Sequence, residues 1–193
     1  TPDRAADDQQ RKGLEAAFIA SYRLEAGESP PANFGRIIPG YQQSTYRNGG
    51  VRGGRLADGE NEPNAERGCP PKTWANFEAV TDRNWMGSDW SDPYRLADRL
   101  DADPPDVGLY RIWYEGDVPS LAYIGESSNI GRRLYKHEDT YGGDALFSYA
   151  PRTDLDASHK RGEAECDLIG AHYIAHGCPP RTQFGFTDQI EIS

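Results

Sequence analysis

Residues 108–127, with the sequence GLYRIWYEGDVPSLAYIGES, carry two short triplets of similar composition. Gly-Leu-Tyr stands at 108–110 and Tyr-Ile-Gly at 123–125, each with one glycine, one aliphatic residue and one tyrosine. The alternation over residues 107–114 predicts a strand, and residues 121–124 predict a second one after a short turn. Two short strands joined in this way form an antiparallel hairpin. Both tyrosines are therefore expected on one face of the sheet, and both glycines leave room for close approach of another backbone.

The chain after the hairpin predicts a small α+β domain. SSNIGRRLYKHED at 127–139 begins with Ser and Asn as capping residues and continues as a helix with Ile130 and Leu134 facing inward. ALFSYAP at 145–151 predicts a third strand, and residues 161–176 predict a second helix that Gly177 ends. The order β-β-α-β-α indicates a three-stranded antiparallel sheet flanked by helices.

A change of pattern near residue 105 divides the chain into an N-terminal extension, residues 1–105, and a second domain, residues 106–193. In the extension, residues 9–25 repeat apolar side chains at helical spacing and predict one amphipathic helix. Three of the four tryptophans lie in residues 73–90, which indicates a small packed subcore. Residues 92–100 are expected to form a helix opened by an Asp cap.

The charge of the chain is uneven. The net charge of -10 argues against a nucleic-acid partner, because such proteins need cations to displace the counterions on phosphates. Residues 30–57, however, contain no Asp or Glu and hold four arginines, Arg36, Arg47, Arg52 and Arg55. They belong to an irregular segment, residues 27–72, that is either a flexible insertion or a ligand-contacting loop. If the partner is a nucleic acid, arginines at this spacing suit contacts with phosphates, and arginine is also the commonest reader of guanine edges.

The two predicted helices of the second domain supply side chains suited to phosphate chemistry. The first helix offers four within two turns, Arg132, Arg133, Lys136 and His137. Arg133 and His137 are four residues apart and share a face. The second helix offers Glu163 and Glu165. Two phenols, a guanidinium, an imidazole and a carboxylate that converge on a sheet can hold a phosphate and one divalent cation.

These elements together resemble the GIY-YIG nuclease superfamily. The resemblance rests on the two triplets, on Arg133 ten residues after Tyr123, on His137, and on ECDLI at 165–169. It covers residues 107–183, under half of the chain. One departure is Gln183 in CPPRTQ, where the family often has Asn; glutamine makes the same kinds of hydrogen bond.

The resemblance implies a metal-dependent phosphodiesterase that cleaves DNA. Glu165 would hold a single Mg²⁺ or Mn²⁺, and Arg133 would clamp the scissile phosphate. Tyr110 would orient or deprotonate the attacking water, Tyr123 would hydrogen-bond near it, and His137 would relay a proton or bind phosphate. A free phenol has a pKa of about 10, so Tyr110 can act as a base near neutrality only if cations favour the phenolate.

Other roles remain open for several residues. Glu163 competes with Glu165 for the metal, and the register of the Leu-Ile pair favours Glu165. Arg132 and Lys136 are DNA-binding candidates, although charged residues on a helix most often form a solvated face. A zinc site is an alternative for four residues near the C-terminus, Cys166, His172, His176 and Cys178. Helix geometry lets at most three of them meet, so solvent-facing or packed histidines are the simpler interpretation.

Within the family, the size of the chain favours a stand-alone, site-specific endonuclease of restriction type acting on double-stranded DNA. A homing or mobile-element nuclease, a repair-type nicking enzyme and a non-catalytic DNA-binding module are the alternatives. A palindromic target would call for a two-fold homodimer, although the sequence indicates no clear dimer surface. The odd number of cysteines and the lack of a membrane-spanning or signal-peptide pattern predict a cytoplasmic protein with no membrane partner.

Overall fold

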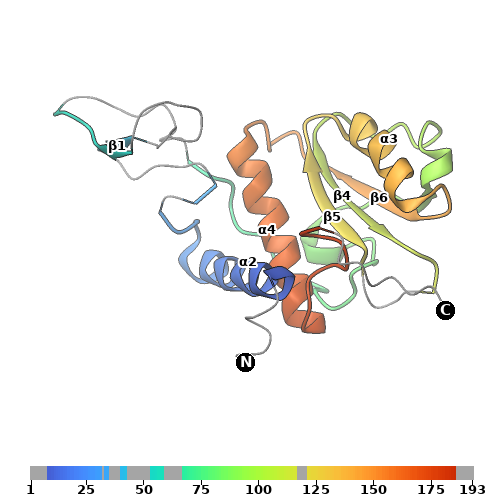
Figure 1. The fold of residues 1–193 in the computed structure, drawn as a ribbon, viewed down its shortest axis with the longest axis horizontal. Helices are drawn as coiled ribbons and strands as arrows, with labels where there is room; N and C mark the ends of the chain where they lie inside the picture. Colours follow the sequence, from blue (N-terminus) through green and yellow to red (C-terminus); the bar gives the residue numbers. More distant parts are fainter. Residues whose placement is uncertain are drawn as a thin grey trace.

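The computed structural model describes residues 8–31, 33–34, 40–42, 53–58, 67–116 and 121–185. Its centre is a four-stranded antiparallel sheet in the order β3 (Tyr94–Arg95), β6 (Leu146–Pro151), β4 (Gly108–Trp113), β5 (Tyr123–Ser127). One face of the sheet packs on α3 (Ile130–Tyr141), the other on α4 (Ser158–His176), and α2 (Asp8–Ala26) lies along the outer side of α4 (Figure 1). The predicted α+β class is confirmed.

The predicted hairpin forms one side of this sheet, with β4 inside and β5 at the edge. Tyr110 of β4 pairs with Gly125 of β5, and Ile112 pairs with Tyr123. All six residues of β4 are buried, because β5 and β6 flank it and helices cover both faces. Side chains alternate along a strand, so Tyr110 and Ile112 pack with the α3 core while Leu109 packs with the α4 core.

The sheet has four strands rather than the predicted three, because the helix expected over residues 92–100 does not form. Its place is taken by β3 and by a single 3₁₀ turn, Leu96–Asp98. Tyr94 pairs with Phe147 on the free edge of β6, and the Leu96 N–H donates to the Ala145 carbonyl at 2.9 Å. Pairing with β6 satisfies backbone groups that a helix would otherwise satisfy internally.

The tryptophan segment is packed, but Trp85 and Trp90 belong to the same core cluster as Leu109 rather than to the small subcore that the composition predicts. Trp85 and Trp90 are fully buried, and a short 3₁₀ helix spans Trp85–Gly87. Arg111 of β4 fixes this segment: its guanidinium carbon lies 4.3 Å from the Trp90 ring centroid, and Nη2 donates to the carbonyls of Thr81 and Asp82 at 3.0 Å. A buried arginine therefore joins the extension to the central strand through backbone carbonyls.

In the second domain, α3 begins at the predicted capping residue and α4 ends at the predicted glycine. The Asn129 side chain caps α3 by accepting from the Arg132 N–H at 2.9 Å, which satisfies one of the free N–H groups of its first turn. Gly177 adopts a left-handed conformation, with φ of 72°, and ends α4. Ile130 and Leu134 of α3 face inward, as predicted.

Helix α2 packs on α4 through its small residues. Its buried face consists of five residues, Gly13, Ala16, Ala17, Ala20 and Arg23. Gly170 of α4 lies at the crossing, where an added Cβ would be 2.5 Å from the Cβ of Ala20. The aromatic residues Phe18 and Tyr22, by contrast, are exposed. The two helix backbones thus approach so closely that only small side chains of α2 fit between them. The larger apolar side chains of Phe18 and Tyr22 remain outside the core.

The described part of the arginine-rich segment is a two-stranded ribbon, in which β1 (Tyr41–Gln42) pairs with β2 (Gly54–Arg55). Arg55 is exposed on β2. Arg36, Arg47 and Arg52 lie outside the described residues, so their predicted contacts with DNA stay predictions.

The extension and the second domain share one core. Ala16, Cys69 and Trp85 from the first 105 residues cluster with Leu109 and Leu168. Within the described ranges, no helix is long and apolar enough to cross a membrane.

The close contact of α2 with α4 makes a direct prediction. Gly170→Ala should lower the free energy of unfolding by about 1–3 kcal/mol, because the added methyl group forces the helices apart. Gly131→Ala on α3 is the matched control: no atom lies within 4 Å of its added Cβ, and the change should be neutral or stabilise by up to about 1 kcal/mol. Urea unfolding of both variants measures the difference, and equal stabilities would contradict this packing.

Candidate active site

The two tyrosines of the triplets lie side by side on the α3 face of the sheet. The ring centroids of Tyr110 and Tyr123 are 6.0 Å apart, and Tyr110 is fully buried. A Cβ on Gly125 would overlap the Tyr110 ring and hydroxyl, and a Cβ on Gly108 would overlap the carbonyl oxygen of Ala150 on β6. The room that the glycines leave is therefore filled from within the protein, by the Tyr110 ring and by the backbone of β6.

Three residues of α3 face the tyrosines at intervals of four, Arg133, His137 and Tyr141. The His137 ring centroid lies 4.9 Å from that of Tyr123 and 5.4 Å from those of Tyr110 and Tyr141. Tyr141 was not predicted as a site residue, although its position four residues after His137 places it on the same helix face. We call Tyr110, Tyr123, His137 and Tyr141 the aromatic cluster.

The aromatic cluster contains a side-chain hydrogen bond and lies beside a cation, Arg133. The Tyr110 hydroxyl lies 2.8 Å from His137 Nε2. Arg133, whose side chain is exposed at the surface, lies close enough to the hydroxyls of Tyr110 and Tyr123 to interact electrostatically with both. Each phenol oxygen thus lies beside a guanidinium that is open to solvent on its other side.

Burial decides the protonation states in the cluster. It lowers the pKa of His137 to about 4, and the nearby Arg133 cation acts in the same direction. Burial also raises the pKa of Tyr110 well above its usual value, and this effect exceeds the opposing effect of Arg133. At neutral pH His137 is therefore neutral, and Tyr110 carries its proton.

Glu165 approaches the cluster from α4, on the side of the edge strand β5. The backbone N–H of Glu126 lies near its carboxylate and favours the charged form. Burial, with the Glu126 carboxylate second, raises the pKa of Glu165 to about 8, while Arg133 opposes that rise. Glu126 itself is paired with Arg161 Nε at 2.6 Å. Glu126 and Arg161 were not predicted from the sequence, because neither position carries a motif signal.

This environment fits a divalent cation. A carboxylate with a raised pKa beside a second carboxylate binds either a proton or a cation, and carboxylate oxygen is a ligand that Mg²⁺ accepts. The described ranges contain no group of three or more His, Cys, Asp and Glu side chains that could hold a metal. A cation at Glu165 would therefore take most of its ligands from water, as Mg²⁺ commonly does.

Glu163, the competing carboxylate, faces the other way. It is fully buried on the α2 side of α4, where Ser29 Oγ and the Cys69 N–H each donate to it at 2.7 Å. Arg23 Nη1 lies 3.5 Å from its Oε1. The structure brings Glu165 to the aromatic cluster and places Glu163 in a separate, structural cluster.

Gln183 lies along the outer edge of β5. Its amide oxygen accepts from the Ile124 N–H, and its amide nitrogen donates to the Ile124 carbonyl, both at 2.9 Å. Thr182 Oγ1 lies 2.7 Å from the Tyr141 hydroxyl, which ties the same segment to the aromatic cluster. Gln183 therefore closes the strand edge that carries Tyr123 and holds the strand rather than contacting the phenols.

The residues of the zinc alternative do not form a metal site. His172 is fully buried; its Nε2 accepts from the Leu121 N–H at 3.2 Å and its Nδ1 donates to the Cys178 carbonyl at 2.9 Å. Neither ring nitrogen has a lone pair left for a metal. Cys166 Sγ points toward the Ala16 carbonyl of α2, at 3.8 Å. The expectation of packed histidines is confirmed for His172.

The two remaining helix cations lie beside the site. Arg132 and Lys136 are exposed on α3, on the flank that continues from Arg133. They can contact a ligand that reaches Arg133 from solvent.

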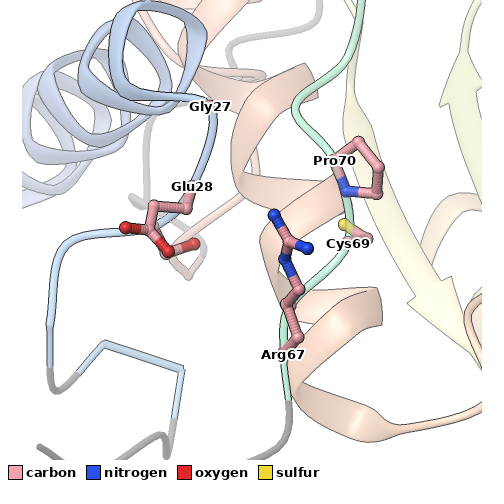
Figure 2. A pocket seen from close by; sticks show the side chains of 7 residues that line it. Gly27, Glu28, Arg67, Cys69 and Pro70 are labelled. Carbon is pink, nitrogen blue, oxygen red and sulfur yellow. The ribbon is translucent and has the colours of Figure 1, made fainter.

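A cavity of about 310 Å³ lies elsewhere, on the side of α4 that carries Glu163. Glu28 from the end of α2 and Arg67 lie on opposite sides of it (Figure 2). None of the predicted site residues lines this cavity. The candidate site is thus an open surface around Arg133 rather than this pocket.

Comparison of the chain with protein-family models, with curated proteins and with solved structures gives no match.

The protonation states can be tested by NMR. The imidazole of His137 should titrate with a pKa near 4, and in Arg133→Gln this pKa should rise, because removal of a nearby cation favours the protonated ring. His172, whose pKa burial lowers to about 4 without a contribution from Arg133, serves as the internal control and should not move. An unchanged His137 pKa in Arg133→Gln would contradict the proximity of the two side chains.

Proposed function

We propose that this protein is a metal-dependent DNA endonuclease of the GIY-YIG type that hydrolyses phosphodiester bonds. The observation that carries the proposal is the convergence of five side chains from four elements, Tyr110, Tyr123, Arg133, His137 and Glu165. A phosphodiesterase needs a cation for the phosphate, a path for the proton of the attacking water and a carboxylate for a metal. The five residues supply each of these.

Arg133 is the phosphate-binding group. Its guanidinium lies beside two phenols and remains exposed, so it can form a forked pair with phosphate oxygens. The charge that develops on these oxygens during hydrolysis would be stabilised by the same group.

The proton path leads through Tyr110. A buried, protonated phenol is a poor base on its own, but its hydroxyl lies 2.8 Å from the neutral His137. In the tautomer protonated at Nδ1, Nε2 can accept the Tyr110 proton while the phenol oxygen takes a proton from water. Tyr123, which Arg133 also contacts, would orient that water.

Glu165 would hold the divalent cation, Mg²⁺ or Mn²⁺. When bound, the ion supplies charge stabilisation at the non-bridging and leaving oxygens. The Glu126 carboxylate, which pairs with Arg161, adds a second negative charge beside Glu165.

Double-stranded DNA is the proposed substrate, and cleavage at specific sites of restriction type is the proposed activity. Arg132 and Lys136 extend the cationic surface from Arg133 along α3, and the arginine-rich segment that ends with Arg55 would supply further phosphate contacts. All three cysteines are free, which fits a reducing compartment, and we place the activity in the cytoplasm.

Plasmid cleavage tests the catalytic assignments. The wild type should cut DNA into discrete bands with Mg²⁺ and not with chelator, and Glu165→Gln and Tyr110→Phe should each lower the rate by about 10²–10⁴-fold. Arg132→Ala is the control for Arg133→Ala: it removes an exposed cation one position away and should weaken binding with little effect on the rate at saturating DNA.

A wild type that shifts DNA on a gel but cuts none under any of these conditions would contradict the enzyme assignment. The non-catalytic DNA-binding module would then be the better description. Retention of full activity by Glu165→Gln would remove the metal role from this residue.

The arginine-rich segment can be tested by the salt dependence of binding. Replacement of Arg47, Arg52 and Arg55 by Ala should weaken binding to all sequences and lower the slope of log K against log salt by about one for each phosphate that is no longer neutralised. Arg83→Ala and Arg95→Ala are the matched controls, because both side chains are exposed and lie outside the segment. An unchanged slope in the triple variant would exclude the segment from the DNA interface.

A further inference from the structure

The outer face of α2 is apolar and exposed. Leu14, Phe18 and Tyr22 lie along it at intervals of four residues, and 68% of Phe18 and 45% of Tyr22 is exposed. On a helix this spacing forms one continuous stripe. The opposite face of α2 is already filled by α4 (Figure 1), and among the described residues the stripe is part of neither core cluster.

Charged residues flank this stripe in a symmetric way. Arg11 lies seven residues before Phe18, and Glu25 lies seven residues after it. Seven residues are close to two helical turns, so all three side chains share one face. Leu14 and Tyr22 are also equally spaced about Phe18, four residues on each side.

We propose that the outer face of α2 pairs with the same face of a second copy of this chain, antiparallel about a two-fold axis at Phe18. In that arrangement Phe18 meets Phe18 of the other copy, and Leu14 meets Tyr22. Arg11 of each copy meets Glu25 of the other, which gives two pairs of opposite charge at the ends of the stripe.

The charge pattern disfavours the parallel arrangement. Parallel helices in register would bring Arg11 against Arg11 and Glu25 against Glu25, and like charges at both ends oppose that pairing. Arg11 now contacts Asp8 at 2.6 Å in an exposed pair on its own helix. Such pairs contribute little, so a turn of Arg11 toward a second copy costs little.

This pairing does not depend on nuclease activity, since it can be measured without DNA. If the proposed function holds, a two-fold dimer would present two copies of the site, which is what cleavage of both strands of a palindromic target requires.

The oligomeric state of the full chain tests the proposal. Sedimentation equilibrium over a wide range of protein concentrations should show a reversible dimer, and Phe18→Glu should raise its dissociation constant at least about tenfold. Leu100→Glu is the matched control, because Leu100 is 83% exposed, lies in the turn after the 3₁₀ helix Leu96–Asp98 and plays no part in the stripe. It should leave the dissociation constant unchanged.

Charge reversal distinguishes the orientation. Arg11→Glu alone should weaken the dimer, and the addition of Glu25→Arg should restore it, because only antiparallel helices pair these positions. Circular dichroism of each variant shows whether α2 remains folded. A chain that is monomeric at all concentrations overturns the proposal, as does a dimer that survives Phe18→Glu; failure of the double reversal to restore the dimer overturns the antiparallel arrangement.

Discussion

The buried guanidinium of Arg23 joins the N-terminal extension to the rest of the molecule. Its Nε donates to Asp167 Oδ1 at 2.7 Å, and Nη1 lies 3.5 Å from Glu163 Oε1, with all three side chains fully buried. The same two carboxylates accept the N–H groups of Cys69 and Lys72. One cation thus connects α2, α4 and the segment after residue 67.

This arrangement constrains the fold because buried charges must be paired. Loss of one partner from such a cluster typically costs about 3–5 kcal/mol, whereas the net gain over a well-packed apolar cluster is small. The cluster is therefore expected to add little net stability over an apolar one, although each of its members is needed once the others are buried. Glu165 lies two residues from both Glu163 and Asp167, and two residues correspond to a rotation of about 200° around a helix. The face of α4 that contacts Arg23 is therefore opposite the face that carries Glu165, the candidate catalytic carboxylate.

The chemistry of the candidate site follows from burial of the same kind. Tyr110 can pack against β5 only because Gly125 has no Cβ. Burial raises the pKa of the Tyr110 phenol, so the hydroxyl keeps its proton at neutral pH. The hydroxyl nevertheless lies within hydrogen-bonding distance of a neutral imidazole. A buried phenol, a neutral imidazole and an exposed guanidinium thus lie together between the protein interior and the solvent.

The sequence by itself determined the hairpin, the two later helices with their caps, and the register that puts Tyr110 and Tyr123 on one face, because these depend on local alternation, on helical spacing and on single capping residues. It also determined that Arg133 and His137 share a helix face. Only the tertiary structure decided that residues 94–95 pair with β6 instead of starting a helix. It also decided that α2 packs through alanines and leaves Phe18 outside. It further decided that Glu163 and Glu165 belong to different clusters. Each of these depends on which distant backbone comes close enough to accept a hydrogen bond or exclude a side chain, and sequence patterns carry no information on that distance.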